Sequence, residues 1–139
     1  MNGKWNFHAV VKDFIIDQEI ISESQLNGEI QKSRTWGICN LDTYEYGLRA
    51  EAIVAYDRKN KKIIYWSYDM VTGIHTGEVT IKNKDVHFEF PSVLRGKDVI
   101  MHDVWEYVDD NNFNVKMYTK EAEGLKLLLE GCAKRVKEE

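Results

Sequence analysis

Short runs of β-forming residues alternate with compact polar turns through the middle of the chain. Residues 63–69, 75–81 and 86–90 are rich in β-branched and aromatic side chains, and the polar links between these runs include Gly73 and several lysines. Strands that follow one another at spacings of roughly 8–12 residues are typical of antiparallel sandwiches and barrels. The pattern therefore predicts an all-β, antiparallel fold.

The flanking segments extend this pattern in both directions. Apolar and polar residues alternate from residue 4 to residue 11, and Asn27-Gly28 is a hairpin signal between two further β-rich segments. We expect Pro91 to end the strand before it, because proline cannot donate to a strand ladder. The other predicted strands cover residues 14–26, 29–39, 44–56, 97–108 and 113–118.

The tail from residue 122 to residue 136 fits two patterns. Its apolar residues follow a helical stripe, but Leu125, Leu127 and Leu129 also fit one face of a strand. Gly124 and Gly131 weaken the helix, because an interior glycine costs about 1 kcal/mol relative to alanine. The residue pattern alone leaves both structures open.

Length and composition indicate one ordinary globular domain. The 139 residues suit a single domain over residues 1–139, with 43% hydrophobic and 30% charged residues. The net charge of −4 and the scattered basic residues argue against a nucleic-acid partner. No apolar run approaches the ~18 residues that a membrane span needs, and the start has no signal pattern. We therefore expect a cytoplasmic protein without membrane contact.

Cys39 and Cys132 form no CxxC motif. A reduced pair of small buried residues is the simplest interpretation, and spacing cannot show whether they form a disulfide between an early strand and the last one.

One set of residues carries a resemblance to a known family: Gly3-Lys4-Trp5, the segments 52–57, 65–77 and 104–106, and a late arginine, Arg135. Through these residues the chain resembles the lipocalin-like (calycin) barrels, closest to the bacterial lipocalin-like domains of unknown function. It implies an up-and-down antiparallel barrel of roughly ten strands whose last segment is a strand. It also implies that Arg135 stacks on the Trp5 indole and caps one end of the barrel.

Barrels of this size hold one small ligand or fill themselves with side chains. In a half-empty barrel, Arg34 or Arg49 is suited to bind a ligand carboxylate through its planar fork. Aromatic walls would bury the apolar part of the ligand. The alternative is that the tryptophans are core and the arginines lie outside. The candidate ligand-binding residues are Arg34, Trp36, Arg49, Tyr56, Trp66, Tyr68, His102 and Trp105.

The four histidines are dispersed, but neighbouring strands would bring His87 and His102 together. With Glu89 or Glu106 they would offer two imidazoles and a carboxylate, which suits zinc or iron, or acid–base catalysis. No HxH or HxxxH spacing supports a metal site, and we expect neither metal nor cofactor. No nucleophile elbow or phosphate-binding glycine loop occurs in the sequence.

Three functions follow from these residues. The favoured one is binding of a small, mainly apolar ligand, with or without a carboxylate, in the barrel interior. The second is a small barrel enzyme acting on a hydrophobic acid with a His/Glu acid–base pair. The third is a ligand-free barrel that acts as a homo-oligomeric interaction module, such as a homodimer.

Overall fold

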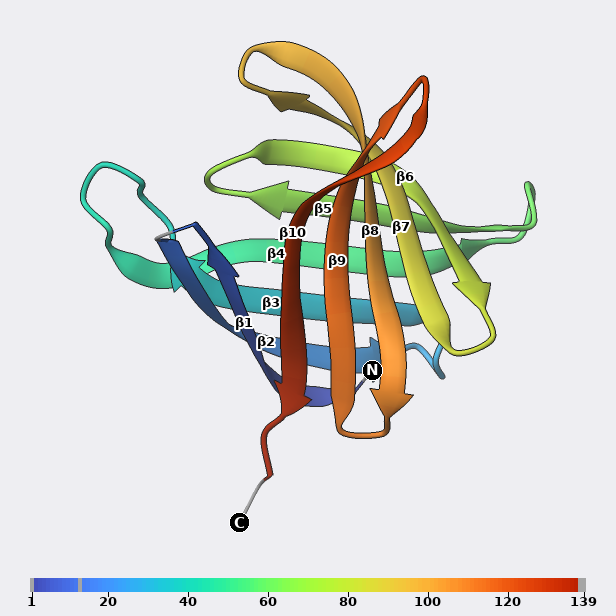
Figure 1. Cartoon of the computed structure of the whole chain (residues 1–139). Coiled ribbons are helices and arrows are strands. Elements are labelled where there is room, and N and C mark those ends of the chain that lie inside the picture. Colours follow the sequence, from blue (N-terminus) through green and yellow to red (C-terminus); the bar gives the residue numbers. More distant parts are fainter. Residues whose placement is uncertain (1, 13, 138–139) are drawn as a thin grey trace.

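The structure is a computed structural model that describes residues 2–12 and 14–137. These residues form ten strands joined by short turns (Figure 1). The strands are β1 (Gly3–Val11), β2 (Phe14–Gln25), β3 (Ile30–Ile38), β4 (Tyr46–Asp57), β5 (Lys62–Asp69), β6 (Gly73–Lys82), β7 (Asp85–Leu94), β8 (Lys97–Asp109), β9 (Asn112–Glu121) and β10 (Gly124–Arg135).

Every strand pairs antiparallel with its neighbours in sequence, and β1 also pairs with β10. The sheet therefore closes into an up-and-down barrel, whose strands are labelled in Figure 1. This confirms the predicted all-β antiparallel barrel. The last segment is a strand, as the resemblance implied. The barrel is compatible with a calycin-like fold.

Pro91 does not end its strand, so that prediction was wrong. β7 continues to Leu94 and pairs with β8 along its whole length, with Pro91 opposite Ile100. Its pairing with β6 stops at Glu89. Beyond Glu89, β7 therefore has a neighbour on one side only, and proline is tolerated at such an edge because no ladder hydrogen bond is lost there.

The bulges in β4 and β10 change which residues face inward. Arg49 is an extra residue in β4, between the pairs Thr35–Ala50 and Trp36–Leu48. A bulge interrupts strict alternation, so Leu48 no longer shares a face with Ala50, although alternation predicts that it does. Leu128 is the corresponding extra residue in β10. It separates Leu125 and Leu127, which are exposed, from Leu129, which packs on the core.

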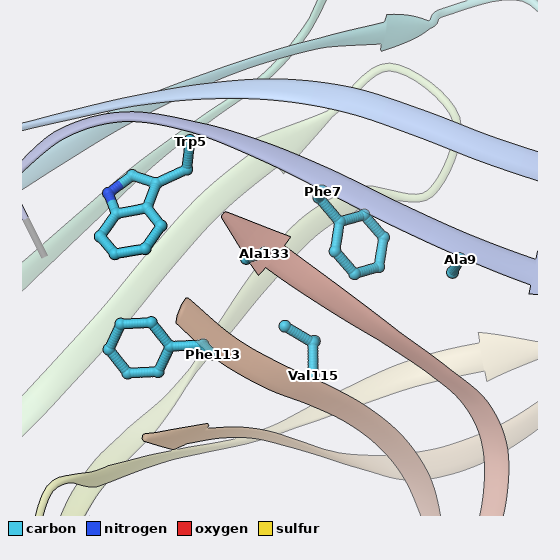
Figure 2. Packing of buried hydrophobic residues seen from close by; sticks show 6 residues of the cluster. All are labelled: Trp5, Phe7, Ala9, Phe113, Val115 and Ala133. Atoms are coloured by element: carbon cyan, nitrogen blue, oxygen red, sulfur yellow. The ribbon is translucent and has the colours of Figure 1, made fainter. Parts of the chain in front are cut away.

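The side of the barrel formed by β1, β9 and β10 has a buried apolar core. Figure 2 shows its side chains, contributed by β1, β9 and β10, converging between the strands. Trp5, Val115 and Ala133 have no exposed surface, and Phe113 packs edge-on against Trp5 with ring centroids 5.3 Å apart. The core residues are Trp5, Phe7, Ala9, Phe113, Val115 and Ala133, which we call the apolar plug.

Arg135 covers the Trp5 side of the plug. Its guanidinium carbon lies 4.4 Å from the Trp5 ring centroid, which confirms the stacking that the resemblance implied. It also donates hydrogen bonds to the backbone oxygens of Asn2 and Asp110. Gly3 has a φ of +112°, and a Cβ there would collide with the Arg135 guanidinium. The absence of a side chain at Gly3 therefore leaves room for the Arg135 guanidinium that covers Trp5.

Within the described ranges, no helix is long and apolar enough to cross a membrane. Cys39 and Cys132 are both free.

Candidate functional site

The inner face of the barrel can be followed across the strands from the buried Trp5. Trp5 pairs with Ile20, Ile20 with Thr35, Thr35 with Ala50, and Ala50 with Asp69. Directly paired residues of antiparallel strands project to the same side of the sheet. These residues, and those that alternate with them along each strand, therefore point into the barrel.

This register divides the eight predicted ligand-binding residues into two groups. The inward or rim group is Tyr56 and Trp105, together with Arg49, the bulge residue that is paired with the inward Asp69. The outward group is Arg34, Trp36, Trp66, Tyr68 and His102.

The two arginines lie in different environments. Arg34 is on the outer face, where its side chain is 63% exposed and its Nε lies 3.1 Å from Glu51 Oε1. Arg49 sits at the β4 bulge and is mostly buried. Its Nε donates to Asp69 Oδ2 at 3.0 Å, and its Nη1 donates to the Ile38 carbonyl oxygen at 3.3 Å. Arg49 is therefore already neutralised by a carboxylate beside one mouth of the barrel.

The predicted aromatic residues are also divided. Trp66 and Tyr68 project outward and are 45% and 50% exposed. Trp36, opposite Glu19, projects outward too. Trp105 points inward and packs against Phe113 of the apolar plug, with ring centroids 5.7 Å apart. Tyr56 lies at the inward rim and is half exposed. Only Trp105 lines the deep interior.

The polar side chains that point into the barrel include Ser67 of β5, His75 of β6 and Asp103 of β8. Ser67 and His75 are direct cross-strand partners, and both are buried. Ser67 Oγ, His75 Nδ1 and Asp103 Oδ1 are enclosed and have no hydrogen-bond partner among the described residues. Buried polar groups are normally satisfied, so three such atoms on one inner face call for an explanation. We call Ser67, His75 and Asp103 the polar trio.

Aromatic rings connect the members of the polar trio. Tyr65 lies 5.2 Å from Phe88 and 5.7 Å from Phe90 between ring centroids, and His75 lies 4.9 Å from Phe90. Asp103 is the cross-strand partner of Phe88. The trio therefore lies within one aromatic-lined part of the interior.

The pKa of Tyr65 reflects the electrostatic environment of the polar trio. Burial raises its pKa, the nearby Ser67 hydroxyl partly opposes that effect, and the carboxylates of Asp103 and Asp69 raise it further. The Tyr65 hydroxyl is thus near Ser67, although no hydrogen bond of ordinary geometry reaches Ser67 Oγ. Tyr65 stays neutral and is a hydrogen-bond donor inside the barrel.

Asp103 is the most perturbed acid described. Burial raises its pKa from 3.8 to about 7. Near neutral pH its carboxyl group can therefore be protonated and donate a hydrogen bond, or ionise and attract a cation. The protonated carboxyl group and the ionised carboxylate can each bind a polar group of a ligand.

Small residues line the wall beside the polar trio. Ala50 and Ala52 point inward from β4, and Gly77 of β6 follows them around the barrel. A Cβ on Gly77 would collide with the Glu89 carbonyl oxygen, so this glycine allows β6 to approach β7 closely. Ala50, Ala52, Val54 and Tyr65 all remain partly accessible, unlike the plug residues.

The predicted meeting of His87 and His102 is confirmed, but on the outer face. His87 Nδ1 lies 2.9 Å from His102 Nε2, and His102 Nδ1 lies 3.3 Å from Glu89 Oε2. Glu106 is instead paired with Lys116 at 2.8 Å. The simplest proton arrangement has His87 donating to His102 and His102 donating to Glu89.

A depression of about 390 Å³ adjoins this chain of hydrogen bonds, and both histidines line it. Burial, the neighbouring His102 and the nearby Lys82 lower the pKa of His87, which favours a neutral imidazole.

His87 Nδ1 and His102 Nε2 lie at hydrogen-bond distance from each other. Among residues 2–12 and 14–137, no three His, Cys, Asp or Glu side chains are grouped so that they could hold a metal ion.

Comparisons of the sequence with protein-family models and with curated proteins give no match.

The polar trio was missed because alternation alone does not say which face of a strand is inside. One signal was present. Asp103 is the only charged residue in the series Met101, Asp103, Trp105 and Tyr107, which otherwise has the composition of an inner face. A lone acid on an apolar face is a candidate for a buried functional group.

Proposed function

We propose that the protein binds a small, mainly apolar molecule in the barrel interior, with the polar trio contacting its polar group. The observation that supports this most directly is the enclosure of Ser67 Oγ, His75 Nδ1 and Asp103 Oδ1 without partners. Leaving a buried polar atom unpaired costs about 1–3 kcal/mol. A ligand that pairs with these atoms recovers that free energy, and the aromatic walls bury its apolar part.

The lipocalin-like assignment is part of this proposal. Its support is the closed ten-strand antiparallel barrel and the Arg135–Trp5 cap. A cytoplasmic location is also proposed, and fractionation of host cells tests it.

Binding can be tested with the neutral apolar fluorophore N-phenyl-1-naphthylamine. We expect saturable 1:1 binding to the wild-type protein. Ala52→Trp places a large ring inside the barrel and should abolish binding. Ala55→Trp is the matched control, because Ala55 lies on the same strand but faces outward. Equal binding by both variants would show that the fluorophore sits outside the barrel and would refute the proposal.

A carboxylate on the ligand was the sequence-based expectation, and Arg49 is its remaining support. Because Asp69 already pairs with Arg49, an acidic ligand has to compete with that carboxylate. Arg34 is on the outer face, so we expect Arg34→Ala to leave binding in the interior unchanged.

The enzymatic alternative is supported by the His87–His102–Glu89 chain beside the outer depression. Glu89 orients His102, His102 accepts from His87, and the second nitrogen of His87 is left as a base. The expected signature is a bell-shaped pH–rate profile on a hydrophobic acid, lost in His102→Asn. An unchanged profile in that variant would remove this chain from catalysis.

The homodimer alternative is supported by the outer face of β5 and β6. Trp66, Tyr68 and Ile74 are neighbours there, and Ile74 is 65% exposed. A second copy related by a two-fold axis could cover them while exchanging the adjacent Arg34–Glu51 contacts. Light scattering of wild type and Trp66→Ser tests this: a wild-type monomer at high micromolar concentration refutes it.

A further inference from the structure

Asp103 stands in the interior without an opposite charge. It projects from β8 between Phe88 of β7 and Met117 of β9, its direct cross-strand partners. Its Oδ1 is enclosed, and the described residues supply no hydrogen-bond donor to it. An unpaired carboxylate in an apolar environment is costly, and a cation is the partner that relieves this cost most.

Of the cations that the register places on the inner face, Lys97 and Lys126 are exposed near strand ends, and the two arginines are engaged. Arg49 pairs with Asp69 at 3.0 Å, and Arg135 lies over Trp5 at the plug. Tyr65 is close enough for the Asp103 carboxylate to raise its pKa, and it is held neutral. His75, on the same inner face, has its Nε2 2.8 Å from Thr72 Oγ1. The charge on Asp103 therefore has no neutralising partner among the side chains that the structure describes on the inner face.

The rings around Asp103 favour the same kind of partner. Tyr65 and Phe88 meet edge to face at 5.2 Å, and Trp105 follows Asp103 on the inward face of β8. The faces of aromatic rings attract ammonium groups, most strongly where water is excluded. A carboxylate beside several rings is thus suited to an organic cation with an apolar body.

We propose that the interior ligand is a small primary amine with an aromatic or aliphatic body, whose ammonium group pairs with Asp103 against the rings of Tyr65 and Phe88. Ser67 and His75 offer acceptors for the remaining ammonium hydrogens. The inference rests on the proposed binding function and narrows it to one class of ligand.

Such a complex contains the ionised carboxylate and the protonated amine. Below pH 7 the free protein holds a proton on Asp103 that binding must displace. The apparent affinity should therefore rise by about 100-fold between pH 5 and pH 8, because the ionised fraction of a group with a pKa near 7 rises by about that factor. Binding at pH 6 should release close to one proton.

The test is calorimetry on the full chain with three ligands of nearly equal shape: 2-phenylethylamine, 2-phenylethanol and phenylacetate. We expect the amine to bind at least tenfold more tightly than the alcohol at pH 8. The preference should disappear in Asp103→Asn and persist in Glu51→Gln, a control that removes an exposed outer-face carboxylate. Repeating the wild-type titration in buffers of different ionisation enthalpy counts the released proton without relying on a variant.

Failure of this inference is distinguishable from failure of the proposed function. If the alcohol binds as tightly as the amine, or phenylacetate binds more tightly, the amine proposal is overturned while interior binding stands. If none of the three ligands binds and the neutral fluorophore does not bind either, both proposals are overturned.

Discussion

The two sides of this barrel use their inward positions differently. On the side of β1, β9 and β10, the inner face is the apolar plug, in which Trp5, Val115 and Ala133 have no exposed surface. On the side of β5 to β8, the inner face carries Ser67, His75 and Asp103, with enclosed polar atoms that lack partners. The first arrangement stabilises the fold, and the second reduces its stability.

This difference shows how a small barrel can maintain a recognition surface. An unpaired buried polar atom costs about 1–3 kcal/mol, which is large beside a total stability of about 5–15 kcal/mol. Packing in the plug offsets that cost, because burying one large apolar side chain contributes about 1.5–3 kcal/mol. Plug substitutions should therefore lower stability, whereas trio substitutions should raise it and lower binding.

The largest expected effect comes from shortening an aromatic residue in the plug. Phe113→Ala removes a ring that contacts Trp5, Trp105 and Tyr107, and should lower the free energy of unfolding by about 3–5 kcal/mol. Phe88→Ala, in the partly accessible wall, should cost about half as much. Urea unfolding measures both. Equal losses would mean that the two sides are packed alike.

Asp103→Asn should stabilise the protein at high pH. The folded carboxyl keeps its proton up to about pH 7, whereas the unfolded one loses it near pH 3.8, so wild-type stability falls as the pH rises across that window. The amide cannot ionise. The variant should therefore gain up to about 4 kcal/mol at pH 8 and almost nothing below pH 4.

Urea unfolding at pH 4, 6 and 8 checks this expectation, with Glu51→Gln as the exposed control. A gain that does not change with pH would show that Asp103 is not held protonated.

Enlarging an alanine tests whether each side has room. Ala133→Leu adds three carbons to a position with no exposed surface, and overpacking of this kind costs about 1–3 kcal/mol. Ala52→Leu adds the same carbons beside the polar trio and should change stability by less than about 0.5 kcal/mol. Thermal unfolding compares them. A large loss in Ala52→Leu would indicate a filled interior.

The smallest effect is expected on the outer face. Arg34→Ala removes an ion pair whose partners are 63% and 57% exposed, and such pairs contribute at most about 1 kcal/mol. The melting temperature should shift by only a degree or two. A larger drop, insensitive to salt, would show that Arg34 contributes through packing.

The strands were predictable because alternation and turn residues are local properties. The closed barrel needed the resemblance as well, since the tail pattern fitted a helix and a strand equally. What failed was the assignment of faces. Trp66 and Tyr68 look like core residues, but Tyr65 and Ser67 take the inner face because register with the β4 alanines decides it. Arg49 shows a second limit of prediction from sequence. Its bulge depends on how β4 pairs with β3, so the sequence of β4 alone does not predict it.

The separation of β6 from β7 beyond Glu89 leaves a short stretch of β7, ending at Leu94, with free backbone groups on one side. Exposed strand edges are where two molecules most readily join their sheets and begin to aggregate. Pro91 stands in this stretch and has no N–H to offer an incoming strand. The residue that looked like a strand terminator thus makes this stretch a poor template for edge-to-edge association, and replacing it with valine would restore a backbone N–H donor there.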